Sequence, residues 1–361
     1  MLPYFCLLIL VFILGVEARN KDYISNLMGE TRWGGYRHTK KTTVYFTVAS
    51  ALVILMTALR YYVGTDYDIY MSWTPMYSMQ LEERLLTLSE PAYPLIARIC
   101  SFFTPDPVLA ISTCGVITIA LAMITIYRNS GDLLFSLLLY LFIIWTETMN
   151  IARQELAVAV VFCGYTFVKD RKIIPYMLCV FLAFLCHVSA FFMVFAYFFF
   201  QMKLKGRTIL LLAAASLLAF VLSEPLLELA IQIVGKDVYR ESDFYVTSVR
   251  LPRIIVNFAP AAFAMWVYRG KELTSDEAFC VKGCLLHGFL AIATARVVYL
   301  SRICWYTAPF VCIGLPELMK GVKGNNRKVF TILILVLFFA YWVYDIASHP
   351  DLNNFTWIWQ R

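Results

Sequence analysis

Residues 173–200 read IIPYMLCVFLAFLCHVSAFFMVFAYFFF, an apolar run of 28 residues interrupted only by His187 and its small neighbours. Both ends of this run are basic, because the sequence KDRK precedes it and Lys203 and Lys205 follow it. Short loops rich in Lys and Arg stay on the cytoplasmic side of a membrane. The run is therefore expected to enter the membrane and return, as a helical hairpin over 173–201 with its turn near His187.

The depth of this turn makes His187 a candidate functional residue. Each arm of the hairpin has about 14 residues, fewer than the roughly 20 that cross a bilayer at 1.5 Å per residue. The tip is therefore expected inside the protein, where non-helical backbone is tolerated only within protein or beside a wet cavity. A neutral imidazole there can accept a proton and a charged one can bind phosphate, although a ring that is simply hydrogen-bonded is the alternative.

The composition agrees with a membrane protein. Of the 361 residues, 61% are hydrophobic and 15% are charged, whereas soluble domains carry about 25% charged residues. We expect an all-α, polytopic membrane protein that forms a single domain over 1–361. The net charge of +7 does not indicate nucleic-acid binding, because Lys and Arg lie in short loops between apolar runs. No Cys/His spacing, Walker loop or Gly-rich fingerprint occurs, so neither a metal nor a cofactor is expected.

The distribution of basic residues predicts a topology. The first apolar run, 1–18, is expected to span the membrane with its amino terminus outside, because the next loop holds six basic residues. The alternation of apolar runs and short loops predicts about 10–12 transmembrane helices. Two longer segments are then placed outside: a net acidic segment over 60–106 and a loop of mixed charge over 235–253.

The outer segment 60–106 contains a short apolar stretch that begins with a polar pair. Residues 91–103 are too few to span a bilayer, so we expect an interfacial or re-entrant helix there. Glu90 is the expected N-cap of this helix and Pro91 its first residue. Capping and catalysis do not exclude each other, because a carboxylate can also accept a proton from a substrate hydroxyl.

The same segment begins with two carboxylates close together. Asp66 and Asp68 are two residues apart, so they share one side of an extended chain but not of a helix. Beside a membrane they can serve as a general base and its partner. The alternative is structural: Asp66 caps a turn after Gly64, and Arg60 extends its charge from the end of the preceding helix.

Arginines supply positive charge on the same predicted face. Asn150 and Arg153 are three residues apart and share a face if they are helical. An arginine fork donates parallel hydrogen bonds to phosphate and keeps its proton, although a loop arginine at the lipid headgroups is the alternative. Arg296 and Arg302 flank the outer end of another predicted helix. Charges near hydrocarbon are unfavourable, and their one-sided distribution indicates chemistry at a membrane surface.

These pieces form an ordered set over about 42–318: Leu59-Arg60-Tyr61, Gly64-Thr65-Asp66-Tyr67, Tyr70, Glu90-Pro91, Asn150, Arg153-Gln154, Ala183, His187, Ser189-Ala190, Ser301-Arg302 and Tyr306. The set resembles the EpsG family of bacterial polysaccharide polymerases, which are related in role to the Wzy O-antigen polymerases. The resemblance implies a multi-pass glycosyltransferase of the GT-C type in the bacterial cytoplasmic (inner) membrane, with its active site facing outside.

The resemblance also implies the substrates and partners. The enzyme would move a growing chain from its lipid diphosphate to a hydroxyl of the next undecaprenyl-diphosphate-linked repeat unit, producing capsule, exopolysaccharide or O-antigen. Besides this lipid-linked oligosaccharide and the bilayer, a flippase and a chain-length regulator are expected partners. For that chemistry the catalytic candidates are Asp66, Glu90 and His187. The candidates for binding diphosphate or sugar are Arg60, Asp68, Tyr70, Arg153, Gln154, Arg296 and Arg302.

Two other functions remain open from the sequence. Transporters and flippases of lipid-linked glycans place their sites near the membrane midplane and often carry inverted repeats. This chain shows no repeat, but His187 is deep enough to keep that reading open. A membrane acyltransferase that modifies glycans would take its acyl donor from the cytoplasmic side, so its histidine should not face outward.

Overall fold

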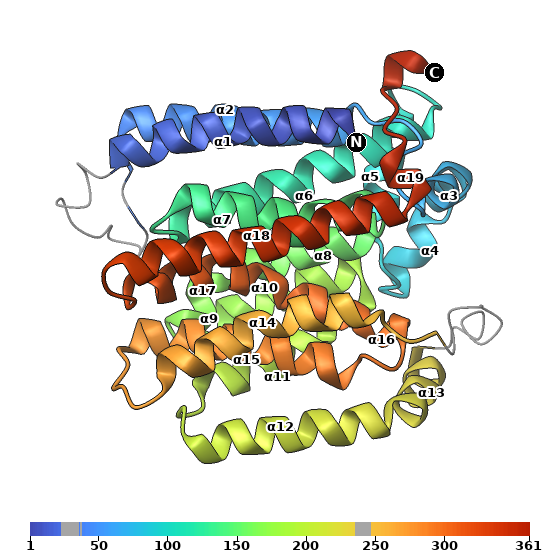
Figure 1. The fold of residues 1–361 in the computed structure, drawn as a ribbon. Coiled ribbons are helices and arrows are strands. Elements are labelled where there is room, and N and C mark those ends of the chain that lie inside the picture. The colour runs from blue at the N-terminus through green and yellow to red at the C-terminus, as the bar shows by residue number, and fades with distance from the viewer. Residues whose placement is uncertain (23–35, 37, 235–246) are drawn as a thin grey trace. The chain divides into compact units, whose positions relative to one another are not determined.

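The computed structural model describes residues 1–22, 36, 38–234 and 247–361 (Figure 1). Of the residues in these ranges 81% are helical, and no strand occurs among them. It divides into two compact units, the first formed by 1–194 and 342–361 and the second by 195–341. The expected loop at 235–253 lies mostly outside the described residues, and its described end leads into a helix that begins at Leu251.

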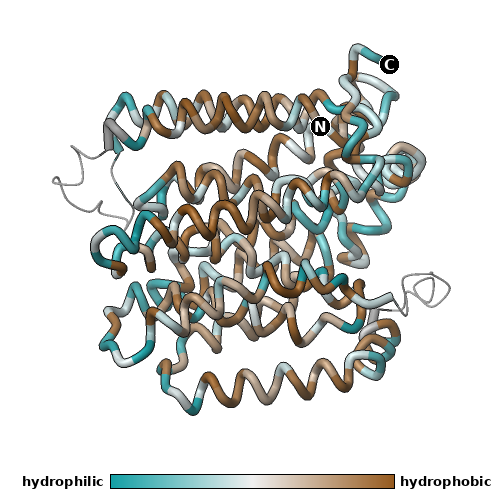
Figure 2. Tube along the Cα trace, viewed as in Figure 1, coloured by the Kyte–Doolittle hydropathy of each residue, from teal (hydrophilic) through white to brown (hydrophobic). Residues whose placement is uncertain are grey.

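Long apolar helices confirm an all-α polytopic membrane protein. Among the described residues, five helices are long and apolar enough to cross a membrane, or seven if two bent helix pairs each form one span. Three shorter apolar helical stretches lie at 133–145, 173–186 and 188–201. In Figure 2 the middles of the long helices are hydrophobic and the hydrophilic residues gather toward their ends. The five helices are α1 (Leu2–Asp22), α2 (Lys40–Ala58), α6 (Pro107–Asn129), α14 (Leu251–Tyr268) and α18 (Asn325–Ser348).

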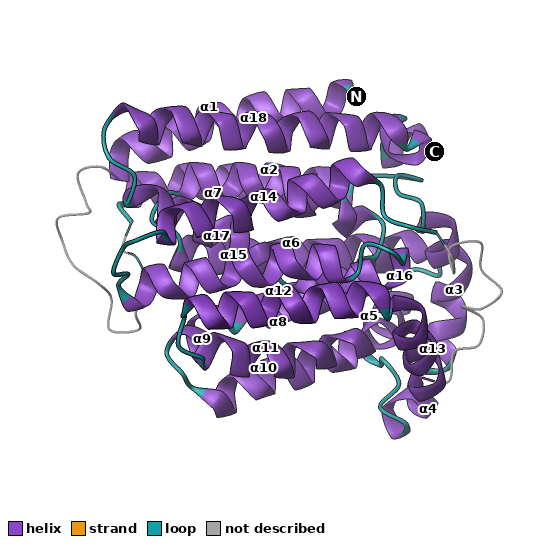
Figure 3. Cartoon of the chain, turned by 60° about the horizontal axis from the view of Figure 1, so that its bottom comes forward, coloured by secondary structure: helices purple, strands orange, loops and turns teal. Residues whose placement is uncertain are grey.

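In the first unit, side-chain caps begin helices α2 and α6. The Thr39 side chain accepts a hydrogen bond from the Thr42 N–H at 3.1 Å, and Asp106 accepts from the Val108 N–H at 3.1 Å. Each cap satisfies a backbone donor that the first helical turn leaves unpaired. Helix α2 packs against α1 and α6, and Figure 3 shows these three helices running side by side. The remaining helices of this unit are α3 (Tyr67–Met79), α4 (Leu81–Leu86), α5 (Ala92–Ser101), α7 (Leu133–Tyr140), α8 (Ala152–Cys163), α9 (Tyr165–Lys169), α10 (Ile173–Cys186), the start of α11 (Met193–Gln201) and α19 (Pro350–Asn353).

The second unit is described by itself. Its helix α15 packs against α14 and α17, and Lys282 on α15 donates hydrogen bonds to the Phe200 and Met202 carbonyls at the end of α11. A Thr274–Glu277 capping box begins α15, which satisfies two orphan donors reciprocally. The helices of this unit, besides the end of α11, α14 and most of α18, are α12 (Gly206–Val221), α13 (Ser223–Val234), α15 (Ser275–Ala293), α16 (Val298–Ser301) and α17 (Ala308–Lys320).

The predicted hairpin with its turn at His187 is confirmed. Helix α10 ends at Cys186, His187 is extended, and a 3₁₀ turn over Val188–Phe192 leads into α11. The Tyr176 hydroxyl donates to the Met193 carbonyl at 3.1 Å. These residues are 17 positions apart and would be about 25 Å apart in a continuous helix. The chain therefore reverses direction at His187.

The segment 60–106, which the sequence predicts to lie outside, forms three helices at one end of the first unit. Helices α3, α4 and α5 lie at the end where α2 finishes (Figure 1). The C-terminal residues join them there, because the Tyr61 N–H donates to the Thr356 carbonyl at 2.9 Å and the Ile358 N–H to the Leu59 carbonyl at 2.8 Å. The short helix expected over 91–103 is present as α5.

Two details of the outer segment differ from the sequence-based expectation. Glu90 is not the N-cap of α5, because Pro91 occupies that position without a side-chain cap bond and the helix begins at Ala92. The Glu90 carboxylate makes contacts with other helices instead. Asp66 and Asp68 lie at the start of helix α3, so they do not share one side as they would in an extended chain.

Candidate active site

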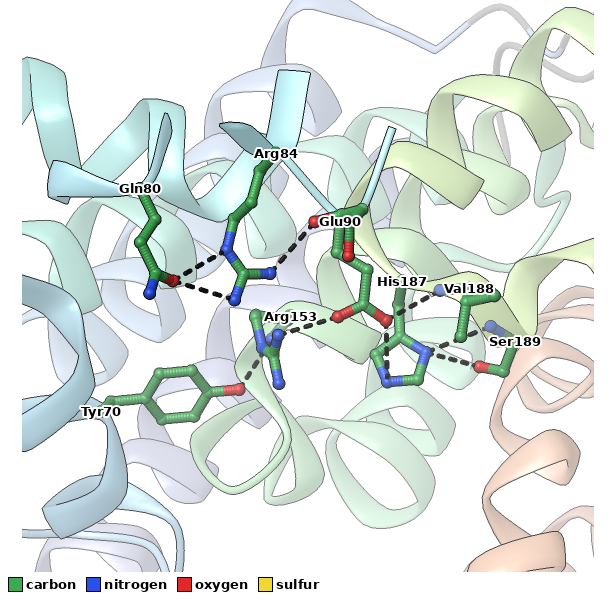
Figure 4. A network of polar contacts seen from close by, with 9 residues as sticks. Tyr70, Gln80, Arg84, Glu90, Arg153, His187, Val188 and Ser189 are labelled. Atoms are coloured by element: carbon green, nitrogen blue, oxygen red, sulfur yellow. Dashed lines mark hydrogen bonds and ion pairs between the residues drawn. The ribbon is translucent and has the colours of Figure 1, made fainter. Parts of the chain in front are cut away.

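Glu90 lies at the centre of a buried polar network (Figure 4). It is 4% exposed and has a φ of 52°, a left-handed conformation that is uncommon for a residue with a side chain. Its Oε2 accepts a hydrogen bond from Arg153 Nη1 at 2.9 Å, and its Oε1 accepts from the Val188 N–H at 3.1 Å. One carboxylate therefore joins the outer segment, α8 and the tip of the hairpin.

The His187 ring is oriented by its neighbour Ser189. The Ser189 N–H donates to His187 Nδ1 at 3.3 Å, and the Ser189 Oγ lies 2.7 Å from the same nitrogen. A backbone N–H can only donate, so the neutral ring carries its proton on Nε2. Nε2 is 4.0 Å from Glu90 Oε1. The hairpin tip thus presents an imidazole N–H beside a buried carboxylate.

Arg153 approaches the same carboxylate from the start of α8. Its backbone N–H donates to the Tyr70 hydroxyl at 3.1 Å, and its guanidinium carbon lies 5.2 Å from the centre of the Tyr77 ring. Its Nε is buried and has no hydrogen-bond partner among the described residues. A buried donor without an acceptor is unfavourable by about 1–3 kcal/mol. An anionic ligand at this position would satisfy it.

Tyr70 belongs to the network through its hydroxyl, which accepts from the Arg153 backbone N–H. Its ring is 5.3 Å from that of Tyr93, and the Tyr93 hydroxyl lies 2.7 Å from Thr74 Oγ1. Burial raises the pKa of Tyr70 to about 12, against the opposing effect of the Arg153 charge and of its backbone hydrogen bond. The hydroxyl therefore stays protonated at neutral pH. It accepts from Arg153 and keeps its own proton as a donor.

A glycine and an amide hold the outer segment against the turn before α8. Gly64 has a φ of +112°, and a Cβ there would lie 2.2 Å from the Met149 carbonyl oxygen. The Asn150 Oδ1 accepts from the Thr65 N–H at 2.9 Å. Asn150 precedes α8, which begins at Ala152, so the condition for a helix face shared with Arg153 is not met. Asn150 instead fixes the entry to α3, close to Tyr70.

Arg60 and Gln154 are buried beside these groups. Arg60 donates from Nη1 to the Thr57 carbonyl at 2.5 Å and from Nε to the Val63 carbonyl at 3.2 Å. The bond to Thr57 satisfies a carbonyl in the last turn of α2, where a helix leaves acceptors unpaired, and the bond to Val63 ties the following loop to the helix end. Gln154 is buried next to Arg153 on α8. Asp68, by contrast, is exposed on the first turn of α3. Binding roles for the three residues stay predictions.

Arg296 and Arg302 belong to the second unit, and each contacts a residue of that unit. Arg296 Nη2 forms an ion pair with Glu224 Oε1 at 2.8 Å. The Arg302 guanidinium carbon lies 5.2 Å from the centre of the Tyr299 ring. Their proposed part in substrate binding stays a prediction.

Sequence analysis did not single out Tyr77 or assign Ser189 a role. Ser189 could have been found from its position two residues after the hairpin histidine, a spacing that favours a local side-chain contact. Tyr77 gave no separate signal, because tyrosines are common at membrane interfaces. Among the described residues no group of three His, Cys, Asp or Glu side chains is arranged to hold a metal ion.

Comparison with known proteins assigns the family. Residues 43–358 match the model of the EpsG family. The chain belongs to the EpsG family. EpsG proteins form a Wzy-like polysaccharide polymerase family, so this EpsG protein is a multi-pass membrane protein with a polysaccharide polymerase-type function. No curated protein and no solved structure gave a match.

Proposed function

We propose that this EpsG protein transfers a growing glycan from its lipid diphosphate onto the next undecaprenyl-diphosphate-linked repeat unit, at the outer face of the bacterial cytoplasmic membrane. The observation that carries the proposal is the contact of Glu90 with Arg153 and its 4.0 Å approach to His187. These residues supply a proton acceptor, a permanent cation and an N–H donor at one end of the first unit. Such a set fits glycosyl transfer from a diphosphate leaving group.

In the proposed reaction, the bond between the donor's anomeric carbon and its diphosphate oxygen breaks, and a bond to the acceptor hydroxyl oxygen forms. The hydroxyl proton passes to Glu90 Oε1. An oxygen about 2.8 Å from both Oε1 and His187 Nε2 is compatible with the 4.0 Å between them. His187 would orient the acceptor hydroxyl in this way, while Glu90 accepts its proton.

The leaving group is a lipid diphosphate that gains negative charge as the bond breaks. Arg153 has a buried Nε without a partner among the described residues, and its guanidinium cannot lose its proton under physiological conditions. A preorganised cation at a developing negative charge is worth several kcal/mol in a water-poor site. Arg153 would therefore stabilise the departing diphosphate.

A host deleted for this gene and complemented with wild type, Arg153→Ala or Glu90→Gln tests the proposal. We expect a ladder of chain lengths with wild type, and single repeats with either variant when strains with matched amounts of the protein in the membrane are compared. An unchanged ladder in the deletion strain would refute the polymerase assignment. Loss of all glycan, including single repeats, would place the protein at an earlier step such as flipping.

The orientation can be tested separately. Leu86 on α4 is 87% exposed and belongs to the segment proposed to face outside. A Leu86→Cys variant should react with a membrane-impermeant maleimide in intact cells above the background of the ten native cysteines. Labelling only after cell lysis would place this end of the first unit in the cytoplasm and contradict the proposed orientation.

A further inference from the structure

Two arginines contact the same tyrosine ring next to Glu90. The guanidinium carbon of Arg84 lies 4.5 Å from the centre of the Tyr77 ring, and that of Arg153 lies 5.2 Å from it. The two cations are therefore within about 10 Å of each other, inside the range at which like charges repel through a partly buried medium. Figure 4 shows both guanidinium groups close to the turn that carries Glu90.

Arg84 is held in place by its neighbours at the α3–α4 junction. Its Nε and Nη2 both donate to Gln80 Oε1 at 3.3 Å, and its Nη1 donates to the Ser89 carbonyl at 3.1 Å. Ser89 directly precedes Glu90, so the same contact fixes the arginine relative to the buried carboxylate. Gln80 and Tyr77 position the guanidinium from the other side.

The two guanidinium groups have more donors than acceptors. Each carries five N–H groups. Arg84 uses three of them in the contacts above, and the Arg153 side chain hydrogen-bonds Glu90 and Tyr70. The Arg153 Nε is buried without an acceptor in the described part of the chain. Glu90 supplies one negative charge against two positive ones, so the arrangement favours a further anion with several oxygens.

We propose that Arg84 is the second guanidinium of the diphosphate site, acting beside Arg153 and positioned by Gln80 and Tyr77. The inference rests on the proposed function. A diphosphate carries at least two negative charges, which Arg153 alone does not balance while it also pairs with Glu90. Two guanidinium groups next to the Tyr77 ring give the diphosphate two sets of donors, because a planar guanidinium matches phosphate oxygens in pairs.

Binding of inorganic pyrophosphate to the purified full-length protein in detergent, measured by calorimetry, tests this site without requiring polymerisation. Arg84→Ala should weaken binding by about tenfold or more, as expected for loss of charged hydrogen bonds. Arg84→Lys keeps the charge without the fork and should give an intermediate affinity. The matched control is Arg98→Ala, because Arg98 lies in the same segment 60–106 and pairs with exposed Glu82 at 3.4 Å. This variant should bind pyrophosphate with the affinity of wild type.

Steady-state polymerisation with a lipid-linked donor separates this inference from the proposed function. Arg84→Ala should raise KM for the donor, and Gln80→Ala should raise it by less, while Arg98→Ala leaves it unchanged. If wild type polymerises and the Arg84 variants bind pyrophosphate and donor normally, this inference is overturned and the proposed function stands. If wild type does not polymerise but binds pyrophosphate through Arg84, the anion site stands and the function fails. Should Arg84→Ala not accumulate, Arg84→Lys decides, since an unchanged affinity overturns the inference.

Discussion

Glu90→Gln is the substitution with the best-defined consequences. The carboxylate accepts one hydrogen bond on each oxygen, from Arg153 and from the Val188 N–H. An amide has a single acceptor oxygen, so its NH₂ group must face one of these two donors. The change therefore removes one hydrogen bond and also leaves Arg153, whose side chain is 15% exposed, without its charge partner.

The magnitude follows from these contacts. Loss of a charged hydrogen bond costs roughly 1.5–3 kcal/mol, and removal of one partner from a fully buried ion pair costs about 3–5 kcal/mol. Because Arg153 keeps some contact with solvent, we expect a loss of about 2–4 kcal/mol in the free energy of unfolding. Removal of the proposed base should lower the polymerisation rate by about 10²–10⁴-fold.

Thermal unfolding in detergent and polymerisation of a lipid-linked donor measure the two effects on the same preparation. Glu82→Gln is the matched control, because Glu82 lies on α4, is 83% exposed and pairs with Arg98 at 3.4 Å. Exposed pairs contribute about 0–1 kcal/mol, so this variant should behave as wild type. The reasoning is refuted if Glu90→Gln unfolds like Glu82→Gln and still makes chains at the wild-type rate.

Three further predictions concern the surroundings of Glu90. Gly64→Ala should destabilise the protein by more than about 1 kcal/mol, because the φ of Gly64 is +112° and an added Cβ would meet a carbonyl oxygen. The control is Gly206→Ala, which should not lower the unfolding temperature because no atom lies near the added Cβ. His187→Asn should abolish elongation without loss of stability, since the amide oxygen can replace Nδ1 as acceptor but not the Nε2–H; full activity would contradict a role for Nε2. Burial raises the pKa of Tyr70 from 10.0 to about 12, so its contribution to stability is complete below pH 10 and is lost between pH 10 and 12. Tyr70→Phe should reduce the fall in the free energy of unfolding between pH 10 and 12. An unchanged dependence of this free energy on pH would contradict the role of Tyr70.

The sequence singled out several residues that the structure brings together, but it did not show how they meet. Glu90, Arg153 and His187 were each singled out because charged or polar groups beside apolar runs are unfavourable without a role. Glu90 was expected to cap a helix, since a carboxylate before proline is a common helix start. The structure gives it a left-handed backbone and two bonds to other elements. Tertiary contacts outweighed the local preference.

The sequence by itself determined the membrane class and the reversal at His187. Both depend on the lengths of apolar runs and on the charges that flank them, which are local properties of the chain. Only the tertiary structure decided that Glu90 contacts Arg153, 63 residues away, and the Val188 N–H, 98 residues away. The physical reason is that contacts between distant residues depend on how α5, α8 and the hairpin pack together, and no local pattern encodes that packing.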